Sequence, residues 1–147
     1  MSNLGLSNSL VASKSSATHI LIDEDFESGT GGFTFIATTG SNDTERLKTI
    51  ASGDATDHYA YKILVCFAYT TYNYSIDLAA IEHPSGGHIW IGISQGNNSH
   101  INHDTPSVAT YTGSFTTGNE TAIVLHLVGD RAGNYTIWDN ILIEESK

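Results

Sequence analysis

The chain has 147 residues, which suits one domain and is long enough to bury a single hydrophobic core. Six Lys and Arg residues stand against sixteen Asp and Glu residues, so the formal net charge is −10 and no basic stripe is available to neutralise the phosphates of a nucleic acid. No apolar stretch approaches the roughly 20 residues of a membrane span, which argues against a transmembrane segment. The start of the chain lacks the basic and apolar regions of a signal peptide, which predicts a protein made in the cytoplasm.

The first 18 residues differ in character from the rest of the chain. They are rich in Ser, and their larger apolar residues follow neither a period of two nor a period of 3.6. We expect them to form an N-terminal arm in front of one domain that covers residues 19–147. The apolar residues that this arm would offer to a partner are Leu4, Leu6, Leu10 and Val11.

From residue 19 onward the sequence breaks into short segments with β-type character, separated by clusters of Gly, Asn, Asp and Ser. Only 15% of the residues are charged, and Ser, Thr, Asn and Gly are plentiful, which suits short strands joined by polar turns. We expect an all-β, antiparallel jelly-roll sandwich of eight or nine strands. The predicted strands cover residues 19–23, 33–38, 46–52, 59–69, 72–82, 87–95, 109–116, 122–128 and 135–145.

Two of these segments alternate clearly enough to assign their faces. In residues 87–95 the core-facing side chains are predicted to be Ile89, Ile91 and Ile93, and the outward ones His88, Trp90 and Ser94. In residues 122–128 the core-facing side chains are predicted to be Ile123, Leu125 and Leu127, which leaves His126 on the opposite face. Strands with two such faces need a second sheet to cover the apolar side.

Three stretches of the chain carry a family resemblance. Ile22–Gly29, followed by Gly31-Gly32-Phe33, is similar to an opening motif of Asp-Phe-Glu, glycine and an aromatic residue. Tyr74–Ala80 and Tyr135–Ile143 are similar to a central and a closing strand of the same fold. Together they resemble the jelly-roll carbohydrate-binding modules that accompany xylanases and glucanases, within the galactose-binding-like superfamily. The resemblance implies a sandwich that binds glycans.

Acidic residues near the opening motif suggest a cation site. Asp23, Asp25 and Glu27 alternate, so in an extended segment their carboxylates point to one side, where a hard cation such as calcium would fit. In the resembled modules a structural calcium ion ties the first strand to the last. This implies that Asp25, Glu27 and Asp139 meet near the carbonyl groups of residues 29–32. The alternative is that Glu27 and Asp139 only accept hydrogen bonds from loop amides.

The two tryptophans are the leading ligand candidates. Trp90 lies on the polar face of its strand beside His88, and sugar rings stack on aromatic faces while nearby polar groups bind their hydroxyls. Trp138 is also predicted to point outward, because Asp139 shares the parity of the core isoleucines on the last strand. We predict a ligand site made of His88, Trp90, His126 and Trp138. The alternative is that these large aromatics fill the core or contact another subunit.

Two further patterns have counterparts in enzymes or metal sites. Gly92–Gly96 matches the G-x-S-x-G nucleophile elbow, but no helical pattern follows Ser94 as that elbow requires. His100, His103 and Asp104 could catch a metal in a loop, yet no matching ligand pair fixes a zinc geometry, and surface histidines are the simpler interpretation. Nothing in the spacing selects the two facing carboxylates of a glycosidase. The sequence therefore predicts a protein that is not an enzyme.

The first ten residues are similar in composition to the short N-termini of tailed-phage virion proteins. This second resemblance implies that the arm docks the domain onto a larger particle of like or unlike subunits, such as a phage virion, as an accessory or decoration protein. We therefore predict a non-catalytic, carbohydrate-binding-module-like domain held in an assembly. One alternative is a free-standing lectin-like module that binds a polysaccharide, and a small hydrolase is a third.

Overall fold

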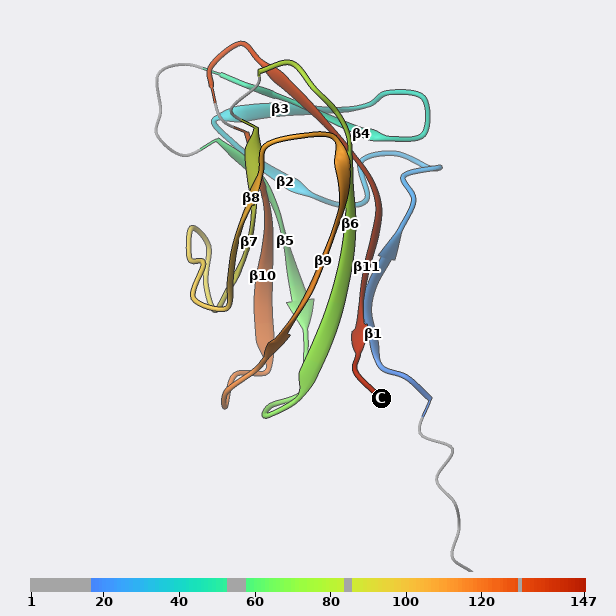
Figure 1. Ribbon diagram of the computed structural model, residues 1–147, viewed down its shortest axis with the longest axis vertical. Helices are drawn as coiled ribbons and strands as arrows, with labels where there is room; N and C mark the ends of the chain where they lie inside the picture. Colours follow the sequence, from blue (N-terminus) through green and yellow to red (C-terminus); the bar gives the residue numbers. More distant parts are fainter. Residues whose placement is uncertain (1–16, 53–57, 84–85, 130) are drawn as a thin grey trace, which may run out of the picture.

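The computed structural model describes residues 17–52, 58–83, 86–129 and 131–147, and these residues form two antiparallel sheets stacked as a β-sandwich (Figure 1). The predicted all-β jelly-roll class is confirmed. No helix in the described ranges is long and apolar enough to cross a membrane. The strands are β1 (Ile20–Glu24), β2 (Thr34–Ile36), β3 (Thr38–Asn42), β4 (Leu47–Ala51), β5 (Tyr59–Val65), β6 (Thr71–Ile81), β7 (Gly87–Gly92), β8 (Ile101–Thr105), β9 (Ala109–Thr116), β10 (Ala122–Val128) and β11 (Tyr135–Glu145).

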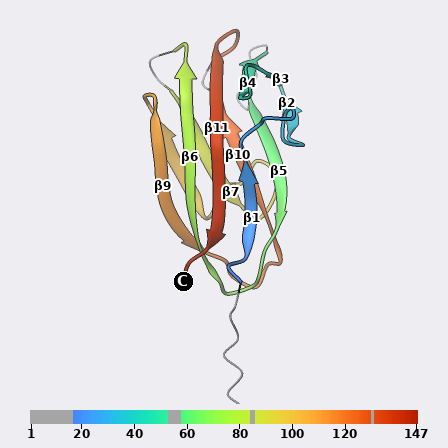
Figure 2. The ribbon, with the colours of Figure 1, turned by 90° about the vertical axis from the view of Figure 1, so that its right-hand side faces the viewer.

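The six-stranded sheet is organised around β11. Its strand order is β3-β4-β11-β6-β9, and β1 pairs with β11 as well. Figure 2 looks onto this sheet, with the other sheet behind it. The Glu145 amide donates a 2.8 Å hydrogen bond to the His19 carbonyl, so the start of β1 and the end of β11 lie side by side at one end of the sandwich.

The five-stranded sheet has the order β2-β5-β10-β7-β8, with β10 in its centre. As the alternation predicted, β10 turns Ile123, Leu125 and Leu127 into the core, and none of the three has exposed surface. The facing side of the six-stranded sheet contributes residues that are equally buried, among them Tyr72, Ile76, Leu78 and Ile141. One contiguous core between the two sheets therefore holds the domain together.

A bulge in β11 overturns two of the predictions made from alternation. The register of β11 against β6 shifts between Asp139 and Leu142, and Asn140 has a left-handed backbone with φ of 41°. One extra residue in a strand reverses the alternation beyond it, so Trp138 faces the same way as Ile141. Trp138 is 0% exposed, and its Nε1 donates a 2.9 Å hydrogen bond to the Thr136 hydroxyl. Trp138 is thus a core residue and not a ligand residue, while Asp139 lines an open pocket instead of facing the core.

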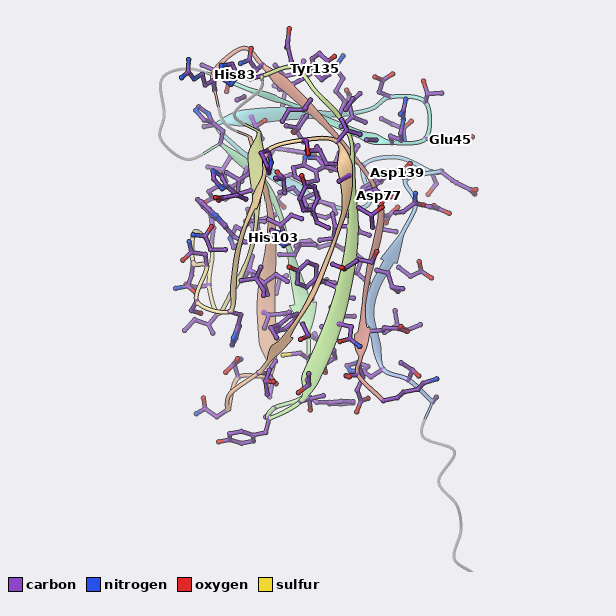
Figure 3. The ribbon with its side chains drawn as sticks, viewed as in Figure 1. Glu45, Asp77, His83, His103, Tyr135 and Asp139 are labelled. Atoms are coloured by element: carbon purple, nitrogen blue, oxygen red, sulfur yellow. The ribbon has the colours of Figure 1, made fainter. Side chains whose placement is uncertain are left out.

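Two strands of the described chain, β3 and β8, were not predicted. Both are edge strands, with a neighbouring strand on one side and solvent on the other. Such a strand need not show the regular apolar alternation by which the other strands were predicted. The histidines around β8 are not the surface residues that the pattern indicated. His103 (labelled in Figure 3) has its Nδ1 2.6 Å from the hydroxyl of buried Tyr74. His100 Nε2 lies 2.6 Å from a carboxylate oxygen of Glu120. The His103 contact joins β8 of one sheet to β6 of the other, and the His100 contact joins the loop before β8 to the loop between β9 and β10.

The strand predicted over residues 87–95 is shorter in the structure. Strand β7 stops at Gly92, and Ile93, which was predicted to face the core, is 56% exposed in the loop that follows. The reason is local: the Ile93 amide donates to the Asn97 side chain at 3.2 Å, so the chain turns there instead of continuing the ladder.

Removing the indole that the bulge turns inward tests this packing. Trp138→Ala is expected to lower the free energy of unfolding by about 3–5 kcal/mol, because it leaves a large cavity in the core. Thr112→Ala, on the exposed face of β9, serves as the control and is expected to change it by less than about 0.5 kcal/mol. Chemical denaturation of both variants measures the difference, and a Trp138→Ala loss as small as that of the control would contradict the placement of the indole.

Candidate functional site

The outward side of the five-stranded sheet carries an unusual set of side chains, which we call the aromatic face. Residues directly opposite each other in neighbouring strands project to the same side of a sheet. One cross-strand row contains Tyr61 of β5, His126 of β10, Trp90 of β7 and Asn102 of β8. The next row contains Tyr59, Val128, His88 and Asp104 in the same strand order.

The rings of the aromatic face contact one another. His88 and Trp90 stack with ring centroids 6.1 Å apart, and Trp90 meets His126 edge-on at 6.2 Å. Tyr59 lies against His126 at 5.1 Å, with the two ring planes nearly perpendicular. The prediction that Trp90, His88 and His126 share the outward face is therefore confirmed, although nothing in the geometry alone assigns them a ligand.

The loop between β7 and β8, residues 93–100, covers part of the aromatic face. The Gly96 amide donates a 2.9 Å hydrogen bond to Nε2 of His126, and the Gln95 amide group donates to the Tyr59 hydroxyl at 3.3 Å. The loop also presses on the strand itself, because a Cβ added at Gly92 would lie 2.2 Å from the Asn97 carbonyl oxygen. Tyr59 and His126 are consequently buried although they lie on the outer side of the sheet.

The hydrogen bond from Gly96 fixes the chemistry of His126. Because Nε2 accepts a hydrogen bond from the Gly96 amide, the proton of the neutral ring is on Nδ1. His126 is 0% exposed, and this burial lowers the pKa of its imidazole, while the Trp90 and Val124 carbonyls act in the opposite direction. Nε1 of Trp90 is shielded from solvent and has no hydrogen-bond partner among the described atoms. The imidazole at the centre of the aromatic face is therefore neutral, and the neighbouring indole N–H has no acceptor within the described chain.

Other parts of the aromatic face remain open to solvent. Tyr61 and Trp90 are half-buried, and His88 Nδ1 lies 2.8 Å from a carboxylate oxygen of the well-exposed Asp104. The predicted ligand site did not include Tyr59, Tyr61, Asn102 or Asp104, and Asp104 had been considered only as a metal ligand. A signal was available for the two tyrosines, since Tyr59 and Tyr61 alternate in a predicted strand, but their alignment with Trp90 depends on the strand order.

The predicted cation ligands lie at the other sheet. Asp25, Glu27 and Asp139 line one polar pocket of about 300 Å³, together with Thr44, Glu45, Arg46 and Asn140. Figure 3 shows Asp139 and its cross-strand neighbour Asp77 on this side of the molecule, with Glu45 at the tip of the β3–β4 hairpin. The structure thus brings the three predicted residues to one place.

Their side chains do not form a ready-made cluster of metal ligands. In the described ranges, no three His, Cys, Asp or Glu side chains are arranged to hold a metal. Oδ1 of Asp25 accepts the Glu27 amide at 3.2 Å, and Oδ1 of Asp139 accepts the Asn140 amide at 2.9 Å. Asp139 therefore accepts a hydrogen bond from a loop amide, as the alternative kept open above expected, whereas Glu27 takes part through its own amide and not through its carboxylate.

The fold has counterparts among solved structures. The CBM22-1 xylan-binding domain of Xyn10C from Paenibacillus barcinonensis superposes with a TM-score of 0.61 at 18% identity, covering 89% of this chain and 97% of that domain. A family 6 carbohydrate-binding module of lichenase 5A from Cellvibrio mixtus, solved with cellotriose, gives 0.56 at 11% identity, covering 88% of this chain and 100% of the module. The K3 cleaved adhesin domain of Lys-gingipain from Porphyromonas gingivalis gives 0.56 at 12% identity, covering 87% and 99%.

These likenesses define the class of the fold. The chain has the same β-sandwich fold as these two carbohydrate-binding modules and the adhesin domain, and it spans nearly the full length of each of the three domains. No protein-family model matches it, and no curated protein matches it. At identities below one fifth, the resemblance is one of fold, so the activity has to be argued from the site.

The buried imidazole predicts a specific pH dependence of stability. The unfolded chain binds a proton at His126 below about pH 6.5, whereas the folded chain resists protonation to a lower pH, so stability falls as the pH drops through this window. His126→Gln keeps an acceptor for the Gly96 amide and removes the titration. We expect the melting temperature of the wild type to fall more than that of His126→Gln between pH 7.5 and 5.5, and identical pH profiles would contradict this.

Proposed function

We propose that this domain is a non-catalytic module that binds a polysaccharide through the aromatic face. The observation that carries the proposal is the cross-strand row of Tyr61, His126, Trp90 and Asn102 on the solvent side of a sheet. Large aromatic side chains in a small sandwich usually pack in the core. Here they lie on the outer side of the sheet, next to polar side chains. The same fold in a domain described as xylan-binding supports this proposal.

The open part of the aromatic face suits a sugar chain. The faces of Trp90 and Tyr61 offer apolar surface on which a pyranose ring can stack. Asn102, His88 and Asp104 beside them offer the donors and acceptors that sugar hydroxyls need. The loop at residues 93–100 would form one wall of the site, since it already contacts the rings at Tyr59 and His126.

The charge on the aromatic face favours a neutral glycan. None of the described outward residues of β2, β5, β7, β8 and β10 is Lys or Arg, and Asp104 is their exposed carboxylate. An anionic sugar would meet this carboxylate and a chain of net charge −10 without a compensating cation. We therefore propose a neutral, xylan- or glucan-like chain as the ligand class.

The aromatic face is not built for hydrolysis. Glycoside cleavage requires two carboxyl groups on either side of the bond, and the described outward residues supply Asp104 alone. Ser94 of the G-x-S-x-G match is exposed in the β7–β8 loop, on no strand-to-helix turn of the described chain. Binding without chemistry is the activity that these residues support.

Truncation of the central indole tests the glycan proposal. We expect Trp90→Ala to weaken binding to soluble xylan or mixed-linkage β-glucan by about tenfold or more, because it removes the stacking surface. Trp90→Phe should retain part of the affinity. Affinity gel electrophoresis with each polymer gives the measurement.

Tyr69→Ala is the matched control, because Tyr69 is 77% exposed in the turn between β5 and β6 and does not belong to the aromatic face. Circular dichroism of all three variants establishes that they are folded at the assay temperature. Equal binding by wild type and Trp90→Ala, or no binding of any neutral polymer by the wild type, would refute the proposal.

A second candidate function is assembly, and one surface feature favours it. Ile63 and Val65 are 64% and 74% exposed on β5, and β2 pairs only with the Tyr59–Tyr61 part of that strand. Exposed apolar side chains beside an unpaired strand edge are a typical protein contact surface. The arm residues Leu4, Leu6, Leu10 and Val11 lie outside the described residues, and attachment to a phage particle has no support from the similar structures.

A charge placed on this edge tests for assembly. If copies of the chain associate through β5, Val65→Lys should reduce the molar mass measured by light scattering, because a buried lysine without a partner is costly. Val108→Lys, at another exposed valine between β8 and β9, is the control and should leave the mass unchanged. A wild type that is already monomeric would remove this candidate.

A further inference from the structure

The segment between β1 and β2, residues 25–33, carries the chain from one sheet to the other, and we call it the crossover turn. Its backbone is left-handed at Phe26, Gly31 and Gly32, with φ of 60°, 60° and 68°. It also inserts two aromatic side chains into the core, since Phe26 and Phe33 are buried with ring centroids 6.1 Å apart. A tight turn with this conformation has to be held by contacts from outside it.

Asn42, at the end of β3, provides the first of these contacts. Its Nδ2 donates to the Phe26 carbonyl at 2.6 Å and to the Gly29 carbonyl at 2.9 Å. One amide group therefore bridges two carbonyl oxygens that a turn of this shape would otherwise leave to water or to a cation. The position is fixed by the sheet, because Asn42 pairs with Leu47 in the β3–β4 ladder.

Lys62 of β5 provides the second contact. By alternation Lys62 belongs to the core-facing side of its strand, with Ala60 and Leu64, where a charged group needs acceptors. Its Nζ reaches the Gly31 carbonyl at 2.5 Å and lies 5.8 Å from the centre of the Phe33 ring. Among the described residues, Lys62 forms no ion pair with a carboxylate, and its ammonium group contacts the crossover turn instead.

Three of the four carbonyl groups of residues 29–32 therefore already accept a hydrogen bond. Calcium takes six to eight oxygen ligands, and carbonyl oxygens of residues 29–32 belong to the set that the family resemblance implies. Here Gly29 faces the Asn42 amide, Gly31 faces an ammonium group, and the Thr30 carbonyl accepts the Phe33 amide at 3.2 Å. A divalent cation at this place would have to displace these donors and would lie beside the positive charge of Lys62.

We propose that Asn42 and Lys62 hold the crossover turn in place of the calcium ion that the resemblance implies, so that this domain is folded and stable without calcium. The Lys62 ammonium supplies the positive charge, and the Asn42 amide supplies the bridging geometry. The inference concerns the fold of the crossover turn and is independent of what the aromatic face binds.

Calcium itself is the first probe. Thermal unfolding of the full-length wild type is compared in excess calcium chloride and in excess EDTA, and calorimetric titration measures calcium binding directly. We expect melting temperatures that agree to within about 1 °C and no stoichiometric binding, because a ligand that binds the native state would raise the melting temperature. A rise of several degrees in calcium, or stoichiometric uptake, overturns the proposal.

Two substitutions test the donors. Lys62→Met keeps the length of the side chain and removes the charge, and we expect it to lower the melting temperature by about 4 °C or more. Lys48→Met, outside the crossover turn, is the control and should lower the melting temperature by less. Asn42→Asp replaces the donor by a carboxylate, which is repelled by the two carbonyl oxygens beside it. In EDTA its melting temperature should lie below that of the wild type, and the decrease should exceed that of the exposed control Asn73→Asp.

If Lys62→Met and Asn42→Asp are as stable as their controls, the donors do not hold the crossover turn and the proposal fails. If Lys62→Met does not fold, the calcium response of the wild type decides the question, because that measurement needs no variant.

Discussion

Strand β11 has to serve two different neighbours along one edge, and the bulge at Asp139 and Asn140 makes this possible. Above the bulge, residues 135–138 pair with β4, and below it, residues 141–144 pair with β1, while β6 follows the other edge throughout. Asn140 stabilises the irregularity by donating from Nδ2 to Asp77 of β6 at 2.9 Å. Without it, Trp138 and Ile141 could not both face the core.

The inner and outer sides of the sheets differ in what their side chains do. The bulge keeps the six-stranded sheet continuous on its inner side, so the core can be filled completely by side chains from between the sheets. The outer side of the five-stranded sheet carries rings that do not belong to this core. Trp90 on the outside and Trp138 on the inside show the division, although both residues lie in strands with similar local sequences of isoleucine and polar residues.

The sequence allowed the fold class and the outward placement of Trp90 and His126 to be predicted, because β7 and β10 alternate regularly up to their ends. It did not allow the face of Trp138 to be predicted, since one inserted residue reverses every later position; the Asp-Asn pair, which tolerates a left-handed backbone, was the available sign. The covering of His126 by Gly96 joins residues 30 positions apart and leaves no local pattern. Lys62 could have been noticed, because it interrupts the core-facing side of an otherwise apolar strand.

The hydrogen bond between Glu145 and His19 has a consequence for how the domain can be connected. Since β1 begins where β11 ends, any polypeptide joined before β1 or after β11 would leave from one end of the sandwich. The crossover turn and the β3–β4 hairpin lie toward the opposite end, and the aromatic face points sideways between the two. Such a domain can be inserted between two others, or circularly permuted by a short link from 147 to 17, without disturbing either sheet.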